Sequence, residues 1–485
     1  MASMSFTALL LLLTVLTGCG TSPPSPTPPT LPSSLPDPVT VVDMIPASLS
    51  GEENQDSEPF LSVHPADPRR MAASAFTPNP AGPASGVAPI FVSEDGGTSW
   101  TLRSILPSAG PVGTGDITHA STGGKAATLY AGILRIPGSS LLNELMTLDF
   151  ASAATMSVQA SRSQVDQPFV QAARIGINDR VYVGNNDFNA APRTATVDVS
   201  LDAGATWKSV RVESRDTAGQ DGPSVRPTVA RDGTVYAAYF GWRSFDGRMA
   251  ISDVVVVRDD GGATTFQALV GSDGLPGRVV ARGVSIPWSN GPTLGQERIG
   301  STLSLAVDPN SSATVYVAWG DRVGNGDIYT IHVRRSSDGG RSWSADLRAI
   351  VNATNVALAI ANNGTVGLLY QQVDGLGSGA RWQTRLEQTR DGFITTQSTI
   401  LASVPADTPE PQFLPYIGDY AYVLAVGEEF RGVFSANNTP DPANFPQGVK
   451  YQRRVNPVTK TLEDASGRGV AISIDPFYFS IPVMR

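Results

Sequence analysis

Short stretches of alternating apolar and polar residues, separated by turn residues, recur along most of the chain. Residues 226–236 are typical, because they predict a strand, a tight Asp-Gly turn and a second strand. Related pairs of strands are expected at 305–319 and 359–366, and residues 58–65 and 167–172 open two further units. Each unit contains about four short strands, so the pattern predicts an all-β protein.

A second motif lies late in most of these units and combines a small polar residue, Asp, Gly, Ser or Thr and an aromatic residue. Three copies fit Ser-x-Asp-x-Gly-x-Ser/Thr-Trp and two are less complete, at residues 93–100, 200–207, 336–343, 258–266 and 389–395. Asp and Ser side chains bond to the local backbone, Gly permits positive φ, and Trp anchors the turn. Since a catalytic acid needs no such repetition, we expect these aspartates to stabilise hairpin turns.

The spacing of the motif aspartates predicts the number of units. Asp95 and Asp202 are 107 positions apart, about twice the shortest interval of 53 positions. A unit without the motif is therefore expected between them. The 78 positions from Asp260 to Asp338 leave room for an insertion around residues 271–296.

A final unit begins near residues 415–420, which brings the count to seven at about 64 residues per unit. Four-stranded sheets repeated at this period around an axis form a β-propeller, here with seven four-stranded blades. Six blades is the alternative count. Either terminal segment, 39–42 or 471–474, would complete a split last blade.

The beginning of the chain differs in composition from the rest. A short apolar run followed by Leu-Thr-Gly-Cys predicts a signal peptide over residues 1–19. The four residues ending at Cys19 resemble the lipobox of bacterial lipoproteins, which implies lipidation of Cys19, export and anchoring at the cell surface or outer membrane. Residues 20–38, rich in Pro, Ser and Thr, predict a flexible tether, and residues 39–485 a single propeller domain.

Charge and cysteine content exclude several classes of function. The formal net charge of −9 argues against nucleic acid as a partner. Cys19 is the only cysteine, so neither an intrachain disulfide nor a thiolate metal site can form. No phosphate-binding loop, zinc spacing or EF-hand loop is evident, and we expect no metal, no cofactor and a monomeric protein.

The turn motif resembles that of a known family. It is similar to the Asp box, or BNR repeat, of bacterial sialidases and related propeller proteins, over residues 58–453. The stretch Gly418-Asp419-Tyr420 also resembles members of the sialidase-like superfamily. The resemblance implies a propeller, but Asp boxes also occur in other glycoside hydrolases, polysaccharide lyases, assembly factors and receptors, so it does not imply one activity.

Sialidases combine an Arg-Ile-Pro segment, three arginines for the substrate carboxylate, an Asp acid/base and a Tyr–Glu nucleophile pair. The planar fork of arginine binds a carboxylate bidentately, and the carboxylate beside the tyrosine assists its hydroxyl as nucleophile. Arg135-Ile136-Pro137 is such a segment, but it follows the first Asp box, whereas in sialidases it precedes that box. Arg135 is therefore either a substrate contact or an ordinary blade residue.

The candidate site residues open the units, because the innermost strands of a propeller converge on its central channel. Aligning the units by the Pro of the first strand puts Glu58, Gln167 and Arg226 at equivalent positions. Carboxylates can supply an acid and a base, and aromatic rings stack on sugars. The predicted catalytic residues are Glu58, Asp116, Tyr416, Asp419 and Tyr420. The predicted substrate-binding residues are Arg135, Gln167, Arg226 and Arg298.

Two functions follow as hypotheses. The first is a cell-surface glycosidase resembling exo-α-sialidases that acts on an acidic glycan. The second is a non-catalytic propeller that binds a glycan or a protein at the envelope, with its channel groups solvated or paired with each other. Among the three histidines, His119 is the best placed for base catalysis or metal binding, and packing within a strand is the alternative.

Overall fold

The structure, a computed structural model, describes residues 38–76, 89–104, 114–123, 127–135, 141–147, 156–189, 194–213, 215, 225–262, 265–287, 302–322, 329–375, 377–409 and 417–485. The compact body runs from Pro38 to Arg485. Its described residues form seven four-stranded antiparallel sheets and one two-stranded sheet. The predicted all-β propeller is thus confirmed, and its four-stranded sheets number seven within the described ranges.

Six of these sheets each contain four consecutive strands. The first two are β2 (Ser57–Val63), β3 (Met71–Phe76), β4 (Pro89–Ser93), β5 (Thr101–Ser104) and β6 (Thr114–Gly123), β7 (Ala127–Arg135), β8 (Leu141–Thr147), β9 (Ser157–Ser163). The next two are β10 (Val165–Ile175), β11 (Asn178–Asp187), β12 (Thr194–Ser200), β13 (Lys208–Arg211) and β14 (Val225–Val229), β15 (Val235–Phe245), β16 (Met249–Asp259), β17 (Arg278–Pro287). The last two are β18 (Leu303–Asp308), β19 (Ser311–Arg322), β20 (Tyr329–Ser336), β21 (Arg348–Val351) and β22 (Ala353–Ile360), β23 (Val366–Asp374), β24 (Arg381–Thr389), β25 (Gln397–Pro405).

The seventh sheet joins the two ends of the described chain. It contains β26 (Tyr422–Val426), β27 (Glu429–Asn437), β30 (Ile474–Pro482) and β1 (Thr40–Asp43), in that order. β30 pairs with β27 on one side and with β1 on the other. Both terminal segments therefore take part in the split last blade.

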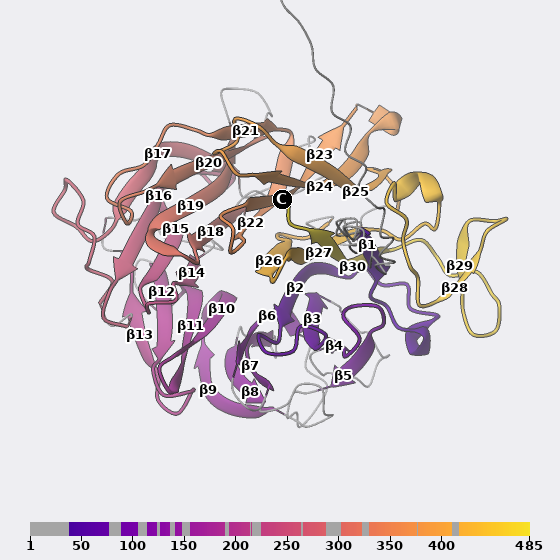
Figure 1. Cartoon of the computed structure of the whole chain (residues 1–485), viewed down its shortest axis with the longest axis horizontal. Coiled ribbons are helices and arrows are strands. Elements are labelled where there is room, and N and C mark those ends of the chain that lie inside the picture. The colour runs from indigo at the N-terminus through magenta and orange to yellow at the C-terminus, as the bar shows by residue number, and fades with distance from the viewer. Residues whose placement is uncertain are drawn as a thin grey trace, which may run out of the picture. The chain divides into compact units, whose positions relative to one another are not determined.

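The seven sheets surround a common centre (Figure 1). Their first strands contact one another in the order β2, β6, β10, β14, β18, β22 and β26, and β26 contacts β2. This closed ring places the innermost strands around one channel and protects the sheet edges that an open array would expose. Because every blade begins with its innermost strand, the first residues of these strands gather at one end of the channel.

The spacing of the motif aspartates predicts the blade without a motif correctly, but its prediction for the segment around 271–296 is wrong. The blade without an Asp motif exists and consists of β6 to β9, as the long interval predicts. The segment around 271–296 was expected to be an insertion, but it supplies β17, the fourth strand of its blade. The alternating residues of β17 pair with β16 and bury part of their apolar side chains, which explains why this segment forms a strand.

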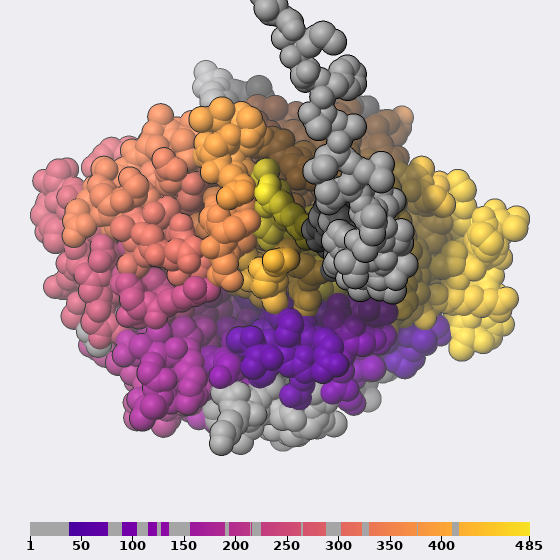
Figure 2. Space-filling view, in the orientation of Figure 1, coloured from indigo at the N-terminus to yellow at the C-terminus, as the bar shows by residue number. Residues whose placement is uncertain are grey.

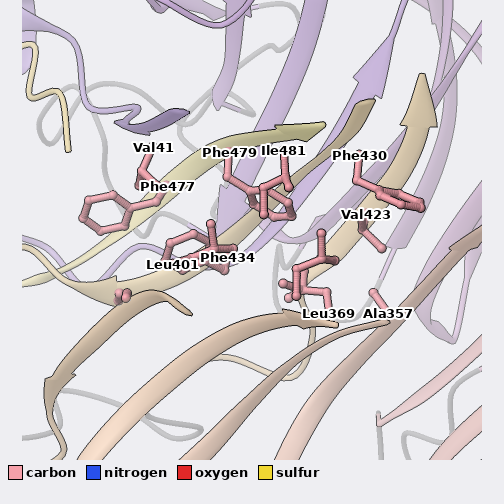
Figure 3. Close-up of a cluster of buried hydrophobic side chains, with 14 of the residues drawn as sticks. Val41, Ala357, Leu369, Leu401, Val423, Phe430, Phe434, Phe477, Phe479 and Ile481 are labelled. Carbon is pink, nitrogen blue, oxygen red and sulfur yellow. The ribbon is translucent and has the colours of Figure 1, made fainter. Parts of the chain in front are cut away.

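Apolar side chains fill the spaces between neighbouring sheets. Figure 3 shows the cluster between the sixth and seventh blades, in which Phe434 of β27 stacks on Phe477 of β30 with ring centroids 5.6 Å apart. Val41 of β1 packs into the same cluster, opposite Leu369 and Leu401 of the sixth blade. Each fully buried side chain of this size contributes about 1.5–3 kcal/mol, so this cluster holds the closing blade against its neighbour.

Helices in the described ranges are single 3-10 turns, η1 (Ala47–Leu49), η3 (Gly377–Gly379) and η4 (Pro442–Asn444). No helix of the described residues is long and apolar enough to cross a membrane. Between β27 and β30 the chain forms the small sheet of β28 (Arg454–Asn456) and β29 (Thr461–Glu463). This excursion lies at the rim of the body, in yellow in Figure 2.

The repeated Asp motifs form tight turns after the third strand of their blades. In the first copy, Asp95 Oδ1 accepts from the Ser99 N–H at 2.9 Å and Asp95 Oδ2 from the Ser99 hydroxyl at 2.6 Å. The Trp100 indole donates to Gly97 O at 3.1 Å and closes the turn. Since neighbouring strands are antiparallel, this turn lies at the end of the blade opposite to the start of its innermost strand. The Asp motifs are thus structural and lie away from that end.

The incomplete copy at residues 258–266 uses a different aspartate from the one expected. Asp259 accepts N–H groups from Gly261, Thr265 and Phe266 at 2.8, 3.1 and 3.1 Å. Asp260, expected to be the motif aspartate, is half-exposed and pairs with Arg258 at 2.5 Å. The strand reaches to Asp259, so this carboxylate is the one that points into the turn.

Candidate functional site

Six predicted site residues meet at the end of the channel where the innermost strands begin. They lie in or just before five of these strands, and all are buried, with exposed fractions of at most 9%. We call them the channel-end cluster: Glu58, Asp116, Gln167, Arg226, Asp419 and Tyr420. The structure brings these six predicted residues together, and their catalytic and binding roles stay predictions.

Bulges at the start of three innermost strands turn polar side chains toward this end. Glu58, Gln167 and Asn355 adopt φ values of 57°, 51° and 55°, in the left-handed region that non-glycine residues rarely occupy. Their strands shift register at the same points, between Ser57 and Phe60, Asp166 and Phe169, and Thr354 and Ala357. Strained residues of this kind, repeated around one opening, are typical of functional sites.

Hydrogen bonds connect the cluster across blades. The Tyr420 hydroxyl donates to Asp116 Oδ1 at 3.1 Å. The Gln167 amide donates to Asp419 Oδ2 at 3.3 Å, and the Asp419 N–H donates to Glu58 Oε1 at 3.2 Å. Four blades therefore contribute to one hydrogen-bond network.

Gly418 permits the close approach of the segment before β26 to β2. Its φ is 88°, and a Cβ at this position would lie 2.6 Å from the Glu58 nitrogen. Its carbonyl oxygen accepts from the Asn355 amide at 3.0 Å. Only glycine fits this position, so the Gly-Asp-Tyr sequence has a structural reason for its first residue.

Arg226 is the cation of the cluster and is only 3% exposed. Its Nε donates to Leu303 O at 3.2 Å, and its guanidinium carbon lies 4.2 Å from the ring centroid of Phe169 and 5.7 Å from that of Tyr420. Burial lowers the pKa of Arg226 to about 10, against the charges of Asp116 and Asp419, which raise it. The side chain therefore stays protonated at neutral pH.

An aromatic layer lies directly beneath the polar groups. Phe60 stacks on Tyr422 with ring centroids 3.9 Å apart and meets Phe169 edge-on at 5.1 Å. Burial raises the pKa of Tyr422 to about 12 and, together with the charges of Asp116 and Glu58, raises that of Tyr420 well above its usual range. Both hydroxyls are therefore neutral, and an ionised Tyr420 is disfavoured.

A cavity of about 290 Å³ occupies the channel on the far side of this layer. Arg226, Phe169 and Tyr422 border it, together with Gln171, whose amide donates to the Tyr422 hydroxyl at 2.9 Å. The remaining walls come from the innermost strands β14, β18, β22 and β26 and are mainly apolar, with Thr228 and Ser304 as the polar exceptions. Arg226 thus contacts Tyr420 of the channel-end cluster and also borders the channel cavity.

The remaining predicted residues are not brought into this cluster by the described part of the structure. The backbone of Arg135 ends β7 and pairs with Thr114, close in the chain to Asp116, but its side chain lies outside what the structure describes. Arg298, Tyr416 and Cys19 also lie outside the described residues.

The sequence analysis missed the aromatic layer and Asn355. Phe60 and Phe169 each follow the Pro that aligns Glu58 with Gln167, so their equivalence was visible in the sequence. Asn355 has no such Pro, and its place in the network depends on the bulge in β22. Nothing in the local sequence indicates that bulge.

The three histidines have structural partners. His119 Nδ1 lies 2.7 Å from the Ser62 hydroxyl, and burial lowers the pKa of His119 to about 3, so it is neutral. His64 Nδ1 accepts from the Asp67 N–H at 2.9 Å. His332 lies between Asp321 and Asp346 on another blade. None of the three belongs to the channel-end cluster.

Comparison with known proteins adds a likeness of architecture. No family model and no curated protein matches the chain by sequence. A mutant α-L-arabinofuranosidase of Fusarium graminearum, in complex with an iminosugar inhibitor, is 12% identical over 74% of this chain and 97% of its own, with a TM-score of 0.44. The α-L-arabinanase of Penicillium chrysogenum complexed with arabinobiose is 13% identical over 91% and 98%, with a TM-score of 0.45. YCF48 bound to a D1 peptide is 11% identical over 82% and 93%, with a TM-score of 0.39. The chain is thus distantly similar in architecture to these proteins, and the likeness leaves its function open.

Proposed function

We propose that this protein binds a glycan at the channel-end cluster and hydrolyses a glycosidic bond there. The observation that carries the proposal is the convergence of three carboxylates, Glu58, Asp116 and Asp419, on one buried site that also holds Tyr420 and Arg226. Burying several carboxylates together costs folding free energy, so proteins retain such clusters mainly where they serve a function.

The residues suit the chemistry of glycoside hydrolysis. That reaction uses two carboxyl groups, one as general acid and the other as base or nucleophile. Asp116 accepts a hydrogen bond from Tyr420 and Glu58 accepts one from the Asp419 N–H, which favours the ionised form that a base or nucleophile needs. We assign the acid to one of these three carboxylates and the orienting hydrogen bond to Tyr420.

In its finer form, the proposal is an exo-α-sialidase-like activity on an acidic glycan. Arg226 is the group that would bind the carboxylate of such a substrate, and Arg135 and Arg298 are the further arginines that this form requires. The position of Arg226 beside Asp116 and Tyr420 supports a sialidase-like activity. Hydrolysis of a neutral glycoside, by contrast, would need only the carboxylates and no arginine.

The experiment is an assay of the full chain against fluorogenic sialosides, uronides and neutral glycosides. We expect turnover of at least one substrate and a decrease of about 100-fold or more in kcat for Asp116→Asn. Asp202→Asn, in an Asp motif away from the channel end, is the matched control and should keep the wild-type rate. A folded wild-type protein that turns over no member of the panel would refute the hydrolase proposal.

The second candidate is a non-catalytic glycan-binding propeller. It is favoured by one observation, that the cluster residues are at most 9% exposed and already bond to one another. Glycan-array binding that Asp116→Asn abolishes, without turnover of the same glycans, would establish it. If the protein instead binds a protein partner and no glycan, this result would support a non-catalytic propeller that mediates protein interaction at the envelope.

We further propose that Cys19 is lipidated and that residues 20–38 hold a monomeric propeller at the cell envelope. The apolar run, the lipobox-like sequence and the Pro-rich composition support this. Metabolic labelling with an alkyne fatty acid should mark the wild-type protein and not Cys19→Ser, which should leave the membrane fraction. Light scattering should give the mass of one chain.

A further inference from the structure

A second buried acidic cluster lies where the two ends of the chain meet. Asp43 ends β1, Asp475 lies in β30, and Glu52 and Asp56 lie in the segment that leads from β1 to β2. Together with Arg453 we call them the closure cluster. All five are buried, and Asp43, Asp56 and Asp475 have no exposed surface.

Arg453, the arginine of the closure cluster, binds the carboxylates of Asp43 and Asp475. Arg453 donates to Asp43 Oδ2 at 3.1 Å and to Asp475 Oδ2, and also to the Glu52 carbonyl oxygen at 3.0 Å. Four carboxylates therefore face one guanidinium, and with all of them ionised the closure cluster carries a net charge of −3. Buried charges of this kind require a counter-charge or protonation.

Two carboxylate oxygens of the closure cluster, Glu52 Oε2 and Asp475 Oδ1, are buried and have no hydrogen-bond partner. Glu52, Asp56 and Asp475 each place an oxygen within 4.8 Å of the other two. Oxygen ligands of Ca²⁺ lie 2.3–2.6 Å from the ion, so ligands on opposite sides of one ion are up to about 5 Å apart.

We propose that Glu52, Asp56 and Asp475 bind one hard divalent cation, Ca²⁺, at the closure of the ring. Carboxylates are the ligands that such cations prefer, and no cysteine or histidine competes at this site. The cation supplies the charge that Arg453 leaves uncompensated and a partner for the two oxygens that have no donor. No local motif in the sequence indicates this site, because its ligands are scattered over more than 400 positions.

The cation would link the segment between β1 and β2, which holds Glu52 and Asp56, to β30, which holds Asp475. The Asp56 N–H already donates to Ile474 O at 2.6 Å, and the Ser473 hydroxyl donates to Asn54 O. Asp56 also lies two positions before Glu58 of the channel-end cluster. Loss of the ion should therefore loosen both the ring closure and the approach to β2.

The test uses the full-length protein, first as purified and then after treatment with EDTA and gel filtration. Elemental analysis of the purified protein should find about one calcium per chain. After EDTA treatment, 1 mM CaCl₂ should raise Tm by about 3 °C or more, and calorimetric titration should give one site. MgCl₂ should have a smaller effect, because Mg²⁺ keeps its water more tightly.

Glu52→Gln should abolish the response to Ca²⁺, and Glu53→Gln, an exposed neighbour with the same change of charge, should retain it. If Glu52→Gln does not fold, Tb³⁺ luminescence of the wild-type protein and its displacement by Ca²⁺ replace this comparison. Purified protein without calcium that also shows no response to Ca²⁺ after EDTA would overturn the proposal, as would equal loss of response in both variants. Neither result depends on glycan hydrolysis.

Discussion

Tyr420 and Asp116 are 304 positions apart in the chain, and the Tyr420 hydroxyl donates a hydrogen bond of 3.1 Å to Asp116 Oδ1. The bond connects the segment before the last blade to the first strand of the second blade. Tyr420→Phe removes the hydroxyl that donates to Asp116 Oδ1. The loss of this hydrogen bond to a buried carboxylate should lower the free energy of unfolding by about 1–3 kcal/mol. Urea denaturation measures this loss. We also expect Tyr420→Phe to decrease glycan turnover or binding, whereas unchanged turnover would exclude Tyr420 from the site.

Arg226 should be essential for the stability of the channel end. Arg226→Ala removes the buried cation beside Asp116 and Asp419 and should lower the free energy of unfolding by about 3–5 kcal/mol. Arg231→Ala is the matched control, because Arg231 is exposed and only donates to Asn362 Oδ1. The control should stay within about 0.5 kcal/mol of wild type. Equal stability of the two variants would contradict the role of Arg226.

Asp259 and Asp260 are neighbours with different roles, so they form a matched pair. Asp259→Ala removes three hydrogen bonds to backbone N–H groups in a turn and should cost about 2 kcal/mol. Asp260→Ala breaks only a partly exposed ion pair with Arg258 and should change stability by less than about 0.5 kcal/mol. Thermal denaturation distinguishes them, and a larger effect at Asp260 would show that the sequence-based assignment was right.

His332 should make stability depend on pH. Burial opposes its protonation, but hydrogen bonds to Asp321 at 3.2 Å and Asp346 at 2.7 Å prevail and raise the pKa of His332 above its ordinary value. This stabilisation is therefore fully present below about pH 6.5, the unfolded value, and is lost as pH rises through the folded pKa. The free energy of unfolding should fall between pH 6 and 8.5 more steeply in wild type than in His332→Gln. Parallel curves would refute the contribution of His332.

Gly418→Ala should disturb the channel end without removing any polar group. The new Cβ would lie 2.6 Å from the Glu58 nitrogen at a backbone position with φ of 88°. We expect the free energy of unfolding to fall by about 1–3 kcal/mol and glycan turnover or binding at the channel-end cluster to decrease with it. Gly427→Ala is the control, because its φ is also positive (61°) but no atom lies within 4 Å of its added Cβ. Stability of Gly418→Ala equal to that of the control would show that the close approach is not required.

The blades and the position of the channel-end cluster could be predicted from local sequence. The Asp-motif turn recurs in five units, and a Pro follows Glu58, Gln167 and Arg226 in three, so one copy helps to identify the others. The contacts between units could not be predicted in this way. The hydrogen bond from Asn355 to Gly418 depends on a bulge, and the pairing of Arg453 with Asp43 spans 410 positions. Such contacts depend on how the ring closes, which no single unit encodes.

The composite seventh blade has a consequence for how this protein is made. β1 is the first and β30 the last of the described strands, so β1 is synthesised long before its partner. The first strand must therefore remain unpaired while the intervening blades fold, and contacts of this range form slowly. A chain that ends before Ile474 would leave β1 without a neighbouring strand, β27 paired only with β26, and Asp43 without Asp475. Synthesis of β30 is thus the event that permits the ring to close, and products truncated before it should be recognisable by an unpaired β1.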